Sequence, residues 1–220
     1  MHRLLVVTIA FVLAAPIADA QVIPVPRRSS APVAWGSLSA GLLQFDRTIL
    51  DGRTESTWDF GSTLMYRGSL EMDVGNYGAV GAVIGLADAP LTYRSTTATG
   101  CLTGCDAHAQ IWSLNAGFHM GGGVGFHQII DLSAGALIYR DFTRDDGDES
   151  LPPDSPDTDV SLSVGYGFGW GFGNRMQLML VQDASYSLHQ RDGLSGGQSS
   201  NSTQYITRLG LRVGLGNKAR

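Results

Sequence analysis

The sequence has almost no lysine, which occurs once in 220 residues, as Lys218. A soluble β-rich domain normally covers its wet face with charged residues such as lysine and glutamate, and this chain has little to use for that purpose. Its 15 basic and 20 acidic residues give a net charge of −5. Nucleic acid requires a basic surface, so we expect no nucleic-acid partner.

Long apolar runs are also missing after the first 20 residues, where no stretch of 18 apolar residues occurs, so the sequence predicts no transmembrane helix. The first 20 residues have a basic start at Arg3, an apolar run over 4–16 and an A-x-A site ending at Ala20. This layout predicts a secretory signal peptide over 1–20 rather than a core helix. A flexible, proline-bearing periplasmic leader is predicted over 21–32.

Glycine is abundant, with 29 residues, and apolar and polar side chains alternate over long segments. Alternation is unbroken over 58–74, 160–172 and 205–215, and it is the pattern of a strand with two different faces. Helical spacing does not produce it. The pattern predicts eight strands near 33–46, 57–74, 78–91, 107–120, 126–140, 159–172, 176–189 and 203–215.

The first predicted strand is ambiguous, because its apolar residues change phase: those up to Leu42 occupy one side of the strand and those from Leu43 onward occupy the other. We therefore expect a β-bulge near Leu42. Short glycine- or asparagine-bearing turns alternate with long polar loops, and this arrangement is typical of outer-membrane barrels. The predicted fold is an all-β, eight-stranded, antiparallel, up-and-down transmembrane β-barrel over 33–215, with short periplasmic turns, long extracellular loops and a C-terminal tail over 216–220.

Alternation alone does not say whether the apolar side chains point out of the barrel or into it, and a soluble lipocalin-like barrel has the same strand pattern. Here the polar phase consists of Gly, Ser and Thr with a few charges, which suits a lumen better than a wet surface. Aromatic residues gather near the strand ends, as in the two belts of a membrane barrel. The predicted belt residues are Trp35, Trp58, Trp112, Trp170, Phe172, Tyr186 and Tyr205.

In these features the chain resembles the small eight-stranded outer-membrane barrels of the OmpA/OmpX-like type. The last strand, over 205–215, is similar to the C-terminal assembly signal of such proteins, although five residues follow where the family commonly ends on an aromatic. The resemblance implies residence in the bacterial outer membrane. It also implies lipid or lipopolysaccharide and the assembly machinery as partners, with an extracellular ligand reached through the loops.

Two loops hold candidate ligands. Cys101 and Cys105 are four residues apart in an exported chain, which predicts a disulfide; adding His108 gives only three metal ligands. The segment 141–159 holds eight acidic residues against Arg144. Its three prolines favour an extended, solvated loop, with weak cation binding as the alternative, and its spacing matches no calcium-loop template.

Charged residues in the polar phases predict a network inside the barrel, because buried charges must pair. The predicted members are Arg67, Glu71, Asp73, His119, Asp131, Asp183, Arg208 and Arg212. Such a network would plug an eight-stranded barrel, whose interior is just wide enough for side chains. Glycines at alternate positions over 165–171 leave one wall bare, so a narrow channel for ions or small solutes remains the alternative.

For catalysis, the best candidates are Ser187, His189 and Asp183, in one phase of one strand. Residues two apart on a strand are separated by about 6.6–6.8 Å, too far for a direct Ser–His contact. We predict no catalytic residue, no metal and no cofactor. The predicted role is structural or in surface interaction, and a lipid-modifying enzyme is the second alternative.

Overall fold

The computed structural model describes residues 32–74, 78–98, 100–147, 149–190 and 200–216. The predicted signal peptide, nearly all of the predicted leader and most of the predicted tail lie outside these residues. Among the described residues, no helix has the length and apolar character needed to cross a bilayer.

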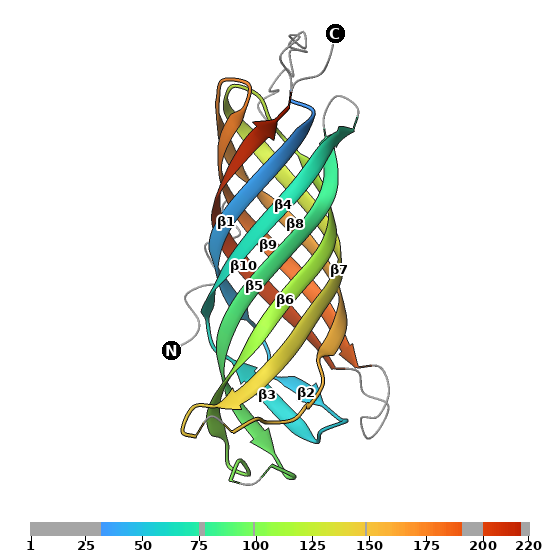
Figure 1. The fold of residues 1–220 in the computed structure, drawn as a ribbon, viewed down its shortest axis with the longest axis vertical. Helices are drawn as coiled ribbons and strands as arrows, with labels where there is room; N and C mark the ends of the chain where they lie inside the picture. The colour runs from blue at the N-terminus through green and yellow to red at the C-terminus, as the bar shows by residue number, and fades with distance from the viewer. Residues whose placement is uncertain (1–31, 75–77, 99, 148, 191–199, 217–220) are drawn as a thin grey trace, which may run out of the picture.

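The described residues form ten antiparallel strands, eight of which close into a barrel (Figure 1). The barrel strands are β1 (Ala34–Phe45), β4 (Thr63–Val74), β5 (Gly78–Ser95), β6 (Cys105–Met120), β7 (Gly125–Arg144), β8 (Asp157–Phe172), β9 (Met176–Gln190) and β10 (Ser200–Leu215). Each pairs with its neighbours along the chain, and β1 pairs with β10 to close the ring. The predicted all-β, eight-stranded, up-and-down barrel is confirmed.

Several strands are longer than a bilayer requires. β5 has 18 residues and β7 has 20, whereas about 9–11 tilted residues cross the hydrocarbon. The predicted strands ended at 91 and 140, and the structure continues them to Ser95 and Arg144. The extra residues extend the wall at the long-loop end, where β2 (Ile49–Asp51) and β3 (Ser56–Phe60) also lie (Figure 1).

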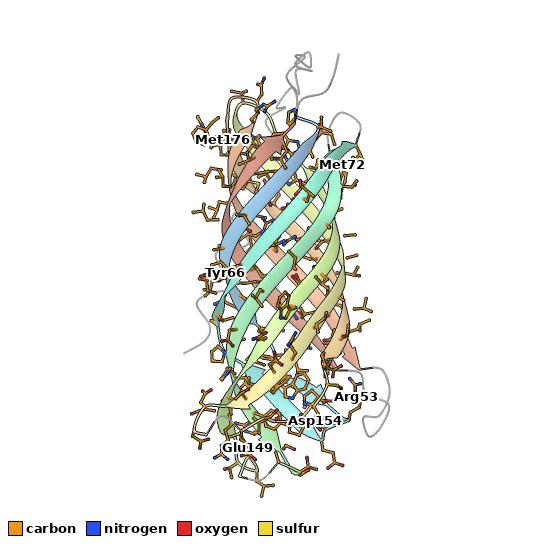
Figure 2. The ribbon with its side chains drawn as sticks, in the orientation of Figure 1. Arg53, Tyr66, Met72, Glu149, Asp154 and Met176 are labelled. Atoms are coloured by element: carbon orange, nitrogen blue, oxygen red, sulfur yellow. A yellow bond between two sulfur atoms is a disulfide. The ribbon has the colours of Figure 1, made fainter. Side chains whose placement is uncertain are left out.

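The outer face of the barrel is apolar. Leu38, Leu70 and Val160 are typical of the outward phase, each more than half exposed. Figure 2 shows Tyr66 on the wall and Met72 and Met176 near the short-turn end, whereas the labelled charged residues lie at the long-loop end. The apolar phase therefore faces outward, as predicted for a membrane barrel and opposite to a lipocalin-like one.

A β-bulge separates β3 from β4. Phe60 pairs with Leu91 and Met65 pairs with Ala87, so five steps on one strand face four on the other. The extra residue lies at Gly61–Ser62 and reverses the side-chain phase, because a bulge shifts the alternation by one. The predicted strand over 57–74 is therefore two strands, β3 and β4, which run in the same direction but have opposite side-chain phases.

The prediction of a bulge near Leu42 is wrong. β1 pairs without interruption with both of its neighbours. Leu42 is 46% exposed on the outer face and Leu43 is 2% exposed on the inner one. Both phases of β1 are apolar here because the interior itself is apolar at this level.

A second irregularity occurs in β7, where the register with β6 shifts between His108 and Gln110. Asp141 adopts a φ of 55°, and the next residue, Phe142, points inward and is buried. Both irregularities thus direct aromatic side chains into the barrel at the long-loop end.

These aromatic residues form the centre of an apolar core. Trp58 lies with its ring centroid 4.6 Å from that of Phe142 and 5.6 Å from that of Tyr139. Ile49 of β2 and Leu151 are buried in the same core. We use the term head for this end of the molecule, comprising β2, β3 and the described residues of 92–108, 141–157 and 188–189.

Candidate functional site

An ionic network fills the interior between the head and the short-turn end. Arg208 of β10 lies between two carboxylates: its Nε donates to Asp183 Oδ2 at 2.6 Å, and a terminal nitrogen donates to Asp131. Arg67 of β4 also reaches Asp183, at 3.2 Å. Since these groups come from four strands, the network crosses the lumen.

A second group of charges lies next to the first. Arg212 donates to Glu71 at 2.7 Å, and its guanidinium lies 4.3 Å from the centre of the Trp35 ring. The Trp35 indole donates to Asp73 at 3.0 Å. His119 Nδ1 lies 2.6 Å from Asp131 Oδ1 and so connects to the first group. The structure thus places all eight residues predicted for the interior network inside the barrel.

Two small cavities lie in the lumen between described residues. One of about 30 Å³ is lined by Arg67, Asn115 and Ser185 among others, and one of about 20 Å³ by Glu71, His119 and Arg208 among others. Each has room for about one or two water molecules.

The glycines over 165–171 were predicted to leave one wall of the lumen bare, but atoms of neighbouring residues fill the space beside them. A Cβ at Gly165 would lie 2.1 Å from Asp183 Oδ1, and one at Gly169 would lie 2.4 Å from the His127 ring. The glycines therefore make room for neighbouring backbone and side-chain groups.

Of the predicted belt residues, five lie on the outer phase and two do not. Those on the outer phase are Trp112, Trp170, Phe172, Tyr186 and Tyr205. The prediction is wrong for Trp35 and Trp58, which are buried in the interior. Trp35 is held under Arg212, and the Gly61–Ser62 bulge turns Trp58 into the head core.

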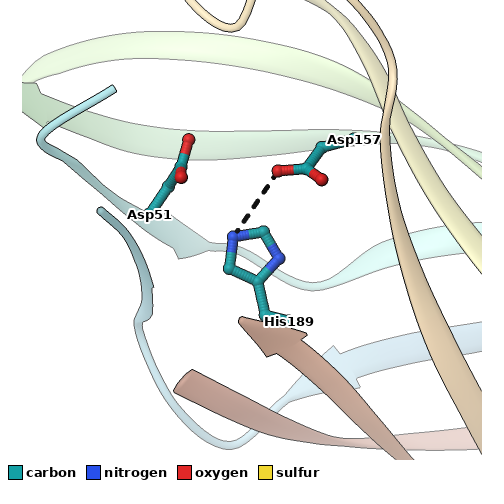
Figure 3. Close-up of side chains that lie close together, drawn as sticks. All are labelled: Asp51, Asp157 and His189. Atoms are coloured by element: carbon teal, nitrogen blue, oxygen red, sulfur yellow. Dashed lines mark ion pairs between the residues drawn. The ribbon is translucent and has the colours of Figure 1, made fainter. Parts of the chain in front are cut away.

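A cluster of buried polar residues lies beside the head core (Figure 3). Asp51 comes from the end of β2, Asp157 from the start of β8 and His189 from the end of β9. One ligand atom of each lies within 4.8 Å of the others, and all three residues are buried. His189 Nε2 and Asp157 Oδ2 are 3.8 Å apart, the separation drawn as a dashed line in Figure 3.

Each member of the cluster is held by further groups. His189 Nδ1 lies 2.8 Å from Asp159 Oδ1, and both side chains are fully buried. Asp157 Oδ1 accepts from Arg53 and from the Thr158 amide. The hydrogen bond to Asp157 and its negative charge raise the pKa of Arg53 above its ordinary value.

Asp51 is fixed by the turn between β2 and β3. Its Oδ1 accepts from the Arg53 amide at 2.9 Å, and its Oδ2 accepts from the Thr54 hydroxyl at 2.6 Å. Two atoms of the cluster have no hydrogen-bond partner although they are buried: His189 Nε2 and Asp157 Oδ2. Buried polar atoms are nearly always paired, so these two atoms are unusual.

The residues considered for catalysis are not brought together. Ser187 Oγ lies 2.9 Å from Ser202 Oγ and accepts from the side-chain Nε2 of Gln204 at 3.1 Å. Asp183 belongs to the ionic network, and His189 is oriented by Asp159. The three residues therefore do not form a nucleophile–base–acid relay.

Asp157 and Asp159 were expected in a solvated loop, and this expectation is wrong because both are buried at the start of β8. The sequence pattern could have indicated their burial, since Asp157 and Asp159 lie in the same alternating phase as Ser161 and Ser163, which point inward. Asp51 carried no comparable signal, because the hairpin that positions it forms only in the folded head. Other acidic residues of the segment, such as Asp145 and Asp146, are exposed as expected.

The predicted disulfide is present, joining Cys101 and Cys105 with a Cα–Cα distance of 5.0 Å. Its sulfurs are bonded to each other, and His108 Nδ1 lies 2.8 Å from Asp145 Oδ1. The three residues therefore do not form the metal site considered above.

No protein-family model matches the sequence, and no curated protein matches it. Solved structures do match. The solid-state NMR structure of the outer membrane protein AlkL in lipid bilayers aligns with a TM-score of 0.50 and 13% identity, over 90% of this chain and 97% of that chain. The chain has the fold of the small eight-stranded outer-membrane barrels.

Two further outer-membrane barrels align less closely. The crystal structure of Neisserial surface protein A gives a TM-score of 0.49 at 12% identity, over 83% of this chain and 97% of that one. OprG from Pseudomonas aeruginosa gives 0.46 at 12% identity, over 86% and 100%. At these identities the likeness concerns the fold of the barrel alone.

Proposed function

We propose that this protein is a closed, non-conducting barrel of the bacterial outer membrane whose head makes contacts at the cell surface. The observation that carries the proposal is the filling of the lumen. Charged pairs occupy one part and an aromatic core the other, with cavities of only about 30 and 20 Å³. Ions need a continuous water path, and the packing of the described residues supports a lumen without one.

Location in the outer membrane is supported by the apolar outer face, which would be costly in water. We expect the exported protein to fractionate with outer membranes. It should require detergent for extraction and migrate faster on unboiled than on boiled gels. Recovery in the soluble periplasmic fraction without detergent would contradict the proposal.

Conductance tests the closed lumen directly. The refolded full-length protein, inserted in planar bilayers, is expected to give no discrete current steps, whereas a 16-stranded porin in the same chamber gives them. Regular steps from the purified protein would support the channel alternative instead.

The head suggests the charge of its partner. Asp145, Asp146, Glu149 and Asp154 are exposed there, and the nearby Arg144 is already paired with Asp146 and Glu149. An acidic, ordered surface favours a positively charged partner, with attraction that weakens as salt screens it.

Vesicles that contain the protein can be mixed with fluorescent polylysine or dextran sulfate. We expect polylysine to bind, with loss at high salt and in an Asp145→Asn/Asp146→Asn/Glu149→Gln variant. Asp88→Asn, on the exposed wall phase, is the matched control and should bind as the wild type does. Equal binding of dextran sulfate, or no effect of the triple substitution, would argue against an acidic contact surface.

A further inference from the structure

We propose that Asp51, Asp157 and His189 form a binding site for one divalent transition-metal ion, with Zn²⁺ the best match to the donor set. The site lies in the head, inside the ring of strands and apart from the ionic network. It goes beyond the proposed surface role and does not depend on what the head contacts.

The spacing of the donor atoms suits a metal. The three ligand atoms lie within 4.8 Å of one another, and His189 Nε2 and Asp157 Oδ2 are 3.8 Å apart. Ligands bound to one zinc ion at 2.0–2.2 Å are separated by about 3.3–3.6 Å. Modest side-chain rotations would therefore bring the three donors onto one ion.

The unpaired atoms point to the same place. His189 Nε2 and Asp157 Oδ2 are buried, lack hydrogen-bond partners and face each other across the cluster (Figure 3). An ion between them would satisfy both atoms at once.

The surrounding groups present the donors to that position. His189 Nδ1 lies 2.8 Å from Asp159 Oδ1, and in the tautomer in which Nδ1 donates to this carboxylate the lone pair of Nε2 is directed toward Asp157. Histidines that bind metals almost always donate their other ring N–H to a carboxylate or carbonyl in this way. The His189 ring is further held by Trp58, with ring centroids 4.9 Å apart.

Asp157 is oriented in a similar manner. Arg53 and the Thr158 amide occupy its Oδ1 and leave Oδ2 for the cluster. Asp51 is held by the Arg53 amide and Thr54.

The donor types select the class of ion. Mg²⁺ and Ca²⁺ prefer all-oxygen sites, whereas an imidazole nitrogen with two carboxylates suits Zn²⁺ and its neighbours in the first transition row. Two carboxylates and a neutral imidazole would balance the charge of a divalent ion. Three protein ligands leave a fourth position for water.

Such an ion would join three distant parts of the chain. Asp51 belongs to the β2–β3 hairpin, Asp157 begins β8 and His189 lies at the end of β9. The bound metal should therefore hold the hairpin and the two strand ends together at the barrel mouth.

The test is titration of the refolded, full-length protein in detergent with Zn²⁺ alone, after treatment with chelator, followed by calorimetry. We expect one equivalent to bind. Asp157→Asn and His189→Gln should each weaken binding at least ~10-fold, and Asp159→Asn should weaken it by about 10–100-fold through His189. His108→Gln alters an exposed histidine–aspartate pair of the head and is the matched control, expected to bind as the wild type does.

Folding of each variant is verified by its faster migration on unboiled gels. Co²⁺ provides an independent readout, since the wild type should give visible absorption bands that His189→Gln shifts or abolishes. The proposal is overturned if folded wild-type protein takes up no Zn²⁺, or if Ca²⁺ binds more tightly than Zn²⁺. It is also overturned if the Asp157 and His189 variants both retain wild-type affinity.

Discussion

Arg208 is a fully charged side chain enclosed within the barrel. It is 5% exposed and donates to both Asp131 and Asp183, which are themselves buried. Removing one member of a buried ion pair leaves an uncompensated charge and costs about 3–5 kcal/mol, whereas an exposed pair contributes about 0–1 kcal/mol. The depth of a charge in the lumen therefore decides its importance for stability.

Arg208→Ala is expected to lower the free energy of unfolding by about 3–5 kcal/mol, because two buried carboxylates lose the cation that they share. Arg140→Ala removes the exposed pair with Asp141 and should change it by less than about 1 kcal/mol. Urea titration of vesicle-embedded protein measures both. Equal stabilities of the two variants would show that the interior network contributes little.

Gly165 makes room for the ionic network. A methyl group at this position would overlap Asp183 Oδ1, which Arg208 and Arg67 hold in place, so Gly165→Ala should cost about 1–3 kcal/mol. At Gly36 the nearest atom would be 3.6 Å away, and Gly36→Ala should be tolerated. The same urea titration distinguishes them, and an undisturbed Gly165→Ala variant would contradict this packing.

At the scale of elements, the two irregular strands determine how the barrel ends. The bulge at Gly61–Ser62 turns Trp58 inward, and the shift in β7 does the same for Phe142. Bulges commonly redirect side chains near functional sites and barrel rims. Here they produce the aromatic core on which the β2–β3 hairpin packs.

The hairpin should open locally when its anchor is shortened. Ile49 is fully buried and Leu50, next to it in β2, is 41% exposed. We expect Ile49→Ala to accelerate tryptic cleavage at Arg47 and Arg53, since the loss of a buried side chain favours local unfolding. Leu50→Ala is the control, and cleavage at equal rates in both variants would refute the anchoring role.

The strand positions could be predicted from the sequence, because every spanning strand has lipid on one side and the lumen on the other, and this imposes an alternation of period two. The bulge at Gly61–Ser62 could not be located in the same way. Its one-residue shift occurs between two apolar phases, so Trp58 and Leu64 read as one continuous face. The sequence also contains no sign that the lumen is apolar near Leu43, which led to a bulge being expected in β1.

The whole molecule has an apolar exterior and an interior divided into two zones, one ionic and one aromatic. Hydrophobicity alone cannot distinguish a tryptophan facing lipid from one inside the barrel, and this is why Trp35 and Trp58 were placed in belts. The candidate metal cluster was missed for a related reason. Its members are far apart in sequence and meet only when β2, β8 and β9 converge.

Tryptophan quenching by brominated lipids tests this arrangement. In variants that each retain a single tryptophan, emission from Trp170, which is 51% exposed on the wall, should be strongly quenched. Emission from Trp35 or Trp58 should be quenched little, because both lie inside the barrel. Strong quenching of Trp58 would mean that β3 faces outward.

The segment between Phe142 and Leu151 illustrates what a separately packed head permits. Leu151 donates its amide to the Phe142 carbonyl at 2.8 Å, and both side chains are buried in the aromatic core, so the base of this segment is anchored independently of its tip. The Arg144 amide and the Glu149 carbonyl, 2.9 Å apart, close the tip above that base. A foreign peptide inserted between Arg144 and Glu149 should therefore be displayed at the surface while the base of the segment stays packed in the aromatic core.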